Sequence, residues 1–154
     1  MELSQSVVPL ERIYLLVLTH EAYLDLHSHI SGSYPVEACG ILLGRSESGM
    51  ALVTRVVPLR NVRESRTEFW IDEKEWMEKI LHAGRLGLEY IGLYHSHPDG
   101  DPLPSPSDRH RMLECPGEVW LIVGYGSGRF DTAAYRVGDD GYSLFSLPVK
   151  ISKG

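Results

Sequence analysis

Cysteine is scarce in this chain of 154 residues, which contains Cys39 and Cys115 and no others. Two cysteines are too few for a disulfide framework, and cysteine is often simply buried in reduced proteins. Long hydrophobic runs are also missing, because the longest run near the N-terminus, residues 13–18, is far too short to span a bilayer. Glu2 lies where a signal peptide carries basic residues. We therefore expect a cytoplasmic protein with no membrane partner.

Blocks of like charge are absent as well, although the formal net charge is -6. Nucleic acids and anionic membranes bind basic patches, so neither kind of partner is expected. The sequence contains no internal repeats and no low-complexity segments. With 43% apolar residues, a chain of this length matches one ordinary globular domain with a substantial core. The expectation is a single domain over residues 1–154.

Hydrophobic periodicity predicts that helices interrupt a series of strands. A strand at residues 13–18 precedes a helix that Thr19 caps, and a second helix begins at Asp72. Gly40, inside an expected strand, indicates a close approach of the backbone. Further strands are expected over residues 38–43, 51–58, 90–94, 119–124, 130–137 and 142–147. This order predicts an α/β or α+β sandwich with a sheet of mixed connection.

The residues that carry chemistry follow the expected strand at 90–94. Residues i and i+2 of an extended chain point to the same side, so His95 and His97 can converge on one metal ion. Four prolines between residues 98 and 106 restrict the following loop and can return Asp108 toward the imidazoles. Two histidines and one aspartate leave a fourth position of a tetrahedral zinc ion open for water. Such a metal lowers the pKa of bound water to about 7 and polarises a carbonyl oxygen.

The ligands and the metal ion each have alternatives in the sequence. Asp99 and Asp101 lie beside His97 and could replace Asp108 as the ligand, although their glycine and proline neighbours favour turns. Ser105 and Asp108 also form a capping box with a proline at the first helical position, and this structural role can coexist with a functional one. Iron or cobalt also fits a site of this composition, but zinc suits hydrolysis without redox chemistry. Hydrolysis also needs a general base, and these residues do not provide one.

The other histidines are not expected to bind metal. His27 and His29 fall in a predicted helix, where residues two apart diverge, and are expected at the surface. His20, His82 and His110 lack partners at ligand spacing and are expected to face solvent.

The stretch His-Ser-His-Pro at residues 95–98, followed by Ser-Pro-Ser-Asp at 105–108, resembles the JAMM motif of the MPN-domain metalloproteases. That motif is His-x-His-Pro and then Ser-x-x-Asp, with ten residues between the second histidine and the aspartate, as here. Residues 37–44, Glu-Ala-Cys-Gly-Ile-Leu-Leu-Gly, look like the family's upstream stretch Glu-x-Cys-Gly-hydrophobic-x-x-Gly. The likeness extends through residues 58–61 and 69–72 and covers most of the chain from about residue 19 to 124.

The resemblance implies the MPN/JAMM fold, a mixed sheet flanked by helices and related to the cytidine deaminases. It implies one zinc ion per chain, held by His95, His97 and Asp108. It also supplies the missing base, because the family's glutamate matches Glu37, which would accept the proton of the attacking water and return it to the leaving amine. The hydroxyl of Ser105 would stabilise the oxyanion together with zinc.

Relatives of this kind cleave isopeptide bonds to ubiquitin, process ubiquitin-like modifiers or trim sulfur-carrier proteins. The segment over residues 59–70 is short, and only ten residues separate Asp108 from Val119. Neither segment leaves much room for an insertion that binds ubiquitin. The resemblance therefore implies a zinc metallopeptidase or isopeptidase of the prokaryotic stand-alone type. Its expected reaction is hydrolysis of an amide bond after the C-terminal tail of a ubiquitin-like or sulfur-carrier protein.

Three other functions fit the sequence less well. A non-catalytic MPN scaffold subunit would carry a broken motif, whereas this motif is whole. A metal-dependent hydrolase of small amides or peptides would not require a folded protein partner. Base deamination is not expected, because the deaminase signature needs a second cysteine shortly after the first and none follows Cys115.

Overall fold

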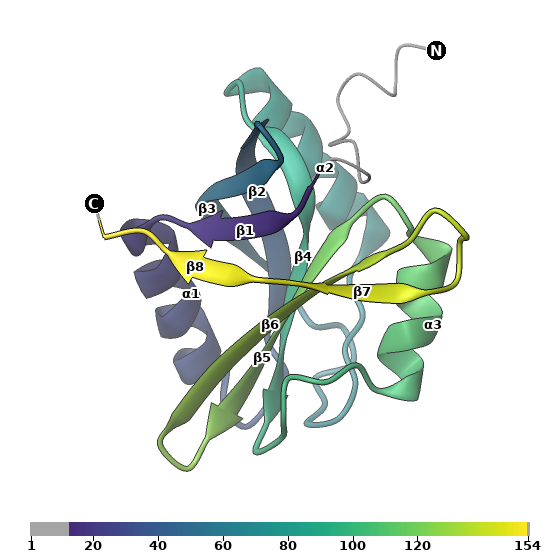
Figure 1. Cartoon of the computed structure of the whole chain (residues 1–154). Coiled ribbons are helices and arrows are strands. Elements are labelled where there is room, and N and C mark those ends of the chain that lie inside the picture. Colours follow the sequence, from purple (N-terminus) through teal and green to yellow (C-terminus); the bar gives the residue numbers. More distant parts are fainter. Residues whose placement is uncertain (1–12, 154) are drawn as a thin grey trace.

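The computed structural model describes residues 13–153, and over this range the chain forms an eight-stranded sheet with helices against it (Figure 1). The strand order is β7-β6-β5-β4-β2-β3-β1-β8. Strands β1 and β3, β1 and β8, and β4 and β5 pair in parallel, and the other neighbours pair antiparallel. The elements are β1 (Leu15–Leu18), α1 (His20–Ser33), β2 (Cys39–Glu47), β3 (Met50–Leu59), α2 (Glu73–Arg85), β4 (Glu89–Pro98), α3 (Pro106–Glu114), β5 (Val119–Gly126), β6 (Arg129–Val137), β7 (Leu144–Leu147) and β8 (Val149–Ile151).

The predicted fold class, a mixed sheet flanked by helices, is confirmed. Thr19 and Asp72 cap α1 and α2 as predicted, since each side chain accepts a hydrogen bond from a backbone N–H of the first turn. Strand β4 runs past its predicted end at residue 94, because its parallel pairing with β5 continues as far as Pro98. No helix within residues 13–153 is long and apolar enough to cross a membrane.

The C-terminal strands differ most from the prediction. The strand expected over residues 142–147 begins only at Leu144, because the Asp140 side chain accepts hydrogen bonds from the N–H groups of Tyr142 and Ser143 and holds both in a turn. The edge strand β8 is three residues long, which is too short for periodicity to reveal it.

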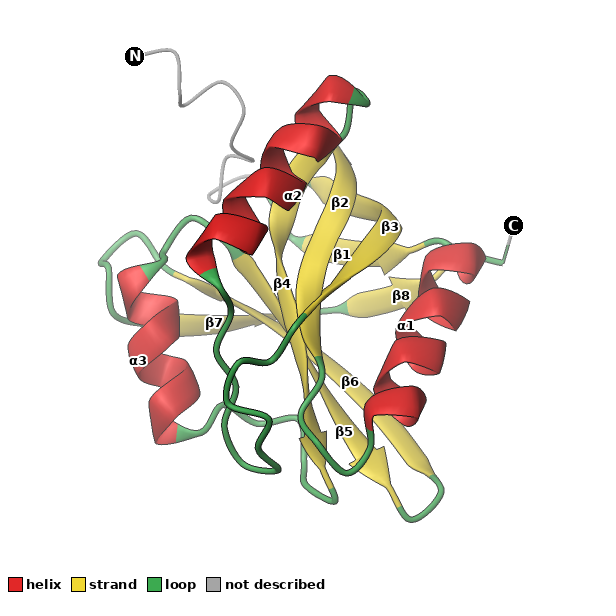
Figure 2. Cartoon of the chain, turned by 180° about the vertical axis from the view of Figure 1, so that it is seen from behind, coloured by secondary structure: helices red, strands yellow, loops and turns green. Residues whose placement is uncertain are grey.

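Two hydrophobic clusters cover the two faces of the sheet. One joins the sheet to α1 through Leu26 and Ile30, and the other joins it to α2 and α3 through Ala83 and Met112. Figure 2 shows α1 and α3 flanking the sheet on either side, with α2 lying in front of it. Because side chains alternate along a strand, β4 contributes successive residues to the two clusters in turn.

The pairing of β2 with β4 determines which residues meet beyond the end of β2. This antiparallel ladder continues past the strand, because Ser96 N–H donates to the Ala38 carbonyl at 3.0 Å and Ala38 N–H donates to Ser96 Oγ at 2.8 Å. Residues directly opposite in such a pair have Cβ atoms about 4.5–5.5 Å apart. Glu37 precedes Ala38, and it lies close enough to His97 for the two side chains to shift each other's pKa.

Gly40 lies in close contact, as predicted, although its neighbour is an aromatic ring rather than backbone. A Cβ atom at this position would lie 2.4 Å from the ring of Tyr94. We expect Gly40→Ala to lower the free energy of unfolding by about 1–3 kcal/mol, because the buried ring has to move. Urea denaturation measures this change. Gly32→Ala in α1 is the control, since its Cβ would meet nothing within 4 Å, and an equal urea midpoint for both variants would contradict the prediction.

Candidate metal centre

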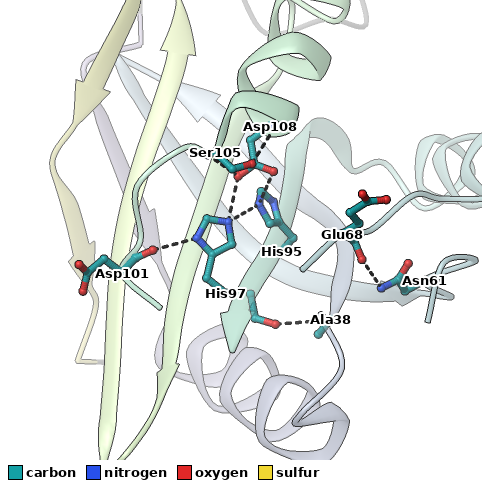
Figure 3. Close-up of polar contacts among 9 residues, drawn as sticks. Ala38, Asn61, Glu68, His95, His97, Asp101, Ser105 and Asp108 are labelled. Atoms are coloured by element: carbon teal, nitrogen blue, oxygen red, sulfur yellow. Dashed lines mark hydrogen bonds and ion pairs between the residues drawn. The ribbon is translucent and has the colours of Figure 1, made fainter. Parts of the chain in front are cut away.

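Two histidines and one aspartate meet where β4 ends and α3 begins (Figure 3). The Nε2 atoms of His95 and His97 are 3.2 Å apart. The Asp108 carboxylate reaches both rings, with Oδ1 at 3.1 Å from His95 Nε2 and Oδ2 at 2.9 Å from His97 Nε2. Within the described range, these three residues are the group of potential ligands whose donor atoms all lie within 4.8 Å of one another. The structure therefore brings together the three predicted ligands.

This donor set fits a divalent metal ion. His97 Nδ1 lies 2.8 Å from the backbone carbonyl of Asp101, which can only accept a hydrogen bond, so the ring proton belongs on Nδ1 and the Nε2 lone pair faces the group. The lone pair on His97 Nε2 and the Asp108 carboxylate, 2.9 Å away, repel each other unless a proton or a cation lies between them. Two imidazoles and a carboxylate provide the nitrogen and oxygen donors that catalytic zinc sites use.

The capping box of α3 orients the aspartate. Ser105 Oγ accepts a hydrogen bond from Asp108 N–H, and Asp108 Oδ2 accepts one from Ser105 N–H, each at 3.0 Å. The positive end of the helix also favours a carboxylate at this position. The predicted capping box is therefore confirmed, and the same carboxylate that closes it reaches both imidazoles.

Aromatic packing orients His95. The ring of Phe69 stacks on the imidazole with centroids 4.3 Å apart and an angle of 23° between the planes, and Trp120 approaches it edge-on. His95 is fully buried, and its Nδ1 has no hydrogen-bond partner among the described residues. The two histidines are thus held differently, one by a ring stack and the other by a backbone carbonyl.

Electrostatics within the group favour an ionised carboxylate. Burial by itself raises the pKa of Asp108, but the interactions of its carboxylate with the two imidazoles, which are strongest when their Nε2 atoms are protonated, outweigh burial and hold the pKa well below its ordinary value. Burial lowers the pKa of His95. Burial also acts to lower the pKa of His97, but the hydrogen bond to Asp108 raises it overall. The ionised Asp108 and the neutral form of His95 suit metal binding, whereas His97 has to lose its Nε2 proton before it can bind a metal ion.

Glu37, the predicted base, lies beside this group. Its side chain is buried, with 4% of the residue exposed, and its Oε1 has no hydrogen-bond partner in the described part of the chain. Burial raises the pKa of this carboxyl to about 8, while the neighbouring His97 lowers it and Asp108 raises it. A buried carboxyl without a fixed partner, next to a group of potential ligands, is suited to transfer protons.

The alternative ligands do not join the group. The Asp99 carboxylate accepts a hydrogen bond from the hydroxyl of Tyr34 at 2.8 Å, and the Asp101 carboxylate pairs with Arg129 at 3.1 Å. Asp101 contributes only its backbone carbonyl, which contacts His97. The alternative in which either aspartate replaces Asp108 therefore disagrees with the structure.

The expected surface positions of His27 and His29 are only partly right, because both side chains are half-buried. His27 stacks on Phe130, and His29 Nδ1 lies 2.7 Å from the hydroxyl of Tyr94. These contacts cross from α1 to the sheet, and helical periodicity alone cannot reveal them. The three histidines that are exposed as predicted are His20, His82 and His110.

Sequence reasoning assigns no role to Phe69 or to Asn61, whose side-chain amide donates to the Glu37 carbonyl at 3.0 Å. Both residues lie within the stretches 58–61 and 69–72 that resemble the family. The family likeness is therefore the sequence feature that could have pointed to Phe69 and Asn61.

A pocket of about 560 Å³ borders the base on the side of α1. Its lining includes His29, Glu37 and Asn61 but none of the three potential ligands.

Comparison with known proteins relates the chain to one family. Residues 19–137 match the model of the Prok-JAB family, described as prokaryotic homologs of the JAB domain. A protein from Desulfitobacterium hafniense, whose solution structure is known, superimposes with a TM-score of 0.80 at 25% identity and covers 90% of this chain and 94% of that one.

Three curated proteins are similar in sequence. A desampylase of Haloferax volcanii is 39% identical over 93 residues, which are 60% of this chain and 65% of that protein, so just under two thirds of its length is matched. A probable TtuB-protein conjugate cleaving protease of Thermus thermophilus is 38% identical over 80% of this chain and 70% of its own. The CysO-cysteine peptidase of Mycobacterium tuberculosis is 27% identical over 82% of this chain and 86% of its own.

Proposed function

Because this chain belongs to the Prok-JAB family, we propose that it is a zinc metallopeptidase that hydrolyses an amide bond after the C-terminal tail of a ubiquitin-like or sulfur-carrier protein. The observation that carries the proposal is the convergence of His95, His97 and Asp108 next to the buried carboxyl of Glu37. Three donors with a base beside them provide the parts of a hydrolytic site.

In this proposal the two histidines and Asp108 hold the zinc ion. When bound, zinc supplies Lewis acidity, which polarises a carbonyl oxygen and makes water more acidic. His97 is held for this role by the Asp101 carbonyl, and Asp108 by its hydrogen bond from the Ser105 N–H. The ring of Phe69 excludes water from the buried side of His95.

Glu37 moves the proton. A cation held by the neighbouring ligands would favour the ionised form of Glu37. The carboxylate then accepts the proton of the attacking water, and the resulting carboxylic acid donates it to the nitrogen of the leaving amine. The low exposure of Glu37 and the missing partner of its Oε1 support this role, since the oxygen is not already engaged by another side chain of the described chain.

Ser105 donates a hydrogen bond to the oxyanion. Its Oγ accepts the Asp108 N–H, so its own O–H remains available as a donor. We expect Ser105→Gly and Ser105→Ala each to lower kcat about 10²–10³-fold, the usual effect of removing an oxyanion donor. Glycine is a nearly neutral helix cap whereas alanine costs about 1 kcal/mol, so the alanine variant alone should also melt at a lower temperature. Full activity in the glycine variant would exclude this role.

The substrate class follows from the relatives. One is named for cleaving TtuB-protein conjugates and another for acting on CysO-cysteine. We extend to this chain the reaction that these names share, cleavage at a bond to a small carrier protein. The compact loops at residues 60–72 and 115–118 are consistent with a small partner.

Intact mass spectrometry tests this proposal. A sulfur-carrier protein with a C-terminal cysteine or short peptide extension is incubated with the zinc-loaded protein or with its Glu37→Ala variant. Loss of the extension with the wild type alone is the expected result. If zinc is bound and no extension is lost, a branched conjugate of the same carrier is tested next, and failure on both substrates would favour the non-catalytic scaffold. Hydrolysis of short peptides at an equal rate would favour the small-amide hydrolase.

A further inference from the structure

Asn61 is the only asparagine in the sequence. Every hydrogen-bonding position of its side-chain amide is occupied. The residue is 8% exposed. Its Nδ2 donates to the carbonyls of Glu37 at 3.0 Å and Glu68 at 3.1 Å, and Figure 3 shows the contact with Glu68. Its Oδ1 accepts from the N–H groups of Arg63 at 2.9 Å and Trp70 at 3.2 Å. These four bonds use the full capacity of the amide and fix its orientation.

We propose that Asn61 is the positioning residue of the site, which holds Glu37 in place for proton transfer. This inference rests on the proposed function, because it concerns the base of that reaction. Asn61 acts through the backbone of Glu37, because its four hydrogen bonds go to backbone groups and none goes to a potential ligand or to the carboxyl of the base.

The position of Glu37 in the sheet explains why such a residue is needed. The pairing of β2 with β3 ends at Cys39 and Leu59, so on that side Glu37 has no neighbouring strand. Its N–H donates to the Ser65 carbonyl at 2.8 Å, and its carbonyl accepts from Asn61. Both partners belong to the segment between β3 and α2, which therefore replaces the missing strand. Without these bonds the backbone of a buried residue would lack partners.

The same amide also shapes the wall of the site. By accepting from Trp70 and donating to Glu68, Asn61 closes the loop that carries Phe69. Phe69 stacks on His95 at 4.3 Å. One side chain therefore links the backbone of the base to the ring that packs against a potential ligand. Small displacements of catalytic groups are costly, since an error of about 1 Å can lower a rate about a hundredfold.

Two variants separate the bonds of Asn61. Asn61→Ala removes all four, whereas Asn61→Asp retains both acceptor bonds and replaces both donors by a carboxylate oxygen, which repels the carbonyls of Glu37 and Glu68. Thr67→Ala is the control in the same loop, because this exposed side chain makes one long contact, with Ser65 Oγ at 3.4 Å. Either variant serves if the other does not fold.

We expect both Asn61 variants to lower kcat about tenfold to a hundredfold with an unchanged KM and one zinc ion per chain. Amide hydrogen exchange, followed by NMR, should accelerate at Glu37 in both variants. At Trp70 it should accelerate only in Asn61→Ala. Thr67→Ala should behave like the wild type in every measurement.

The inference is overturned if the Glu37 amide and kcat are unchanged in both variants, or if kcat falls only together with zinc content. The exchange measurement requires no substrate. If the wild type cleaves nothing, the proposed function fails, and the exchange at Glu37 still decides whether Asn61 holds this residue.

Discussion

Glu37→Ala should bind zinc as tightly as the wild type and yet lose turnover by about 10²–10⁴-fold, the usual contribution of a positioned general base. The reason is that Glu37 lies beside the three potential ligands without being one of them. Its buried Oε1 has no partner among residues 13–153, so its removal leaves no hydrogen bond broken at that atom. The fold should therefore tolerate the change.

Two measurements on the same sample check this expectation: the zinc content after dialysis and the rate at which the extension is removed from the carrier protein. Glu47→Ala is the matched control, because Glu47 lies at the other end of β2 and is exposed, in a surface pair with Arg45. That pair contributes little to stability. If the Glu37→Ala protein is active, Glu37 is not the general base. If the variant binds no zinc, Glu37 is itself a metal ligand.

His97→Ala should lose both zinc and activity, because it removes one of three donors and leaves a site too weak to hold the ion. Binding to the folded state stabilises a protein by about 2.7 kcal/mol when the free ligand is at a hundred times its Kd. For a chain of this size that corresponds to a rise in Tm of about 5–10 °C. The wild type should show this rise when zinc replaces a chelator, and His97→Ala should show none.

His110→Ala provides the control for this experiment. His110 lies on α3, the helix that carries Asp108, but its side chain is exposed and pairs with Glu114 at the surface. This variant should keep the wild-type response to zinc. A zinc-dependent rise in Tm that survives in His97→Ala would show that the ion binds elsewhere, and it would remove the basis for the proposed reaction.

Most of the site could be predicted from local features of the chain. His95 and His97 are two residues apart at the end of a strand, and strand geometry alone orients both toward one side. Asp108 is recognisable because the capping box that begins at Ser105 fixes the first turn of a helix. Glu37 is different. A single buried glutamate has no local pattern, so only the resemblance to a known family singles it out.

The long-range contacts could not be predicted in the same way. Asn61 meets Glu37 across 24 residues of sequence, and the stack of Phe69 on His95 joins a loop to a strand. The contacts of His27 and His29 with the sheet likewise depend on how α1 packs, and helical spacing alone predicts a surface position for both. The start of β7 at Leu144 depends on a turn whose side-chain bonds override the strand pattern.

The sequence alone therefore determined the fold class and the two histidines, and family likeness indicated Asp108 as the third ligand and Glu37 as the base. These features are encoded in spacings of a few residues, where backbone geometry restricts the possible arrangements. Tertiary structure alone decided how the base is held, what packs against His95 and which aspartate reaches the imidazoles. Those outcomes depend on the register of β2 with β4 and on the path of the loop between β3 and α2, and many distant residues set both together.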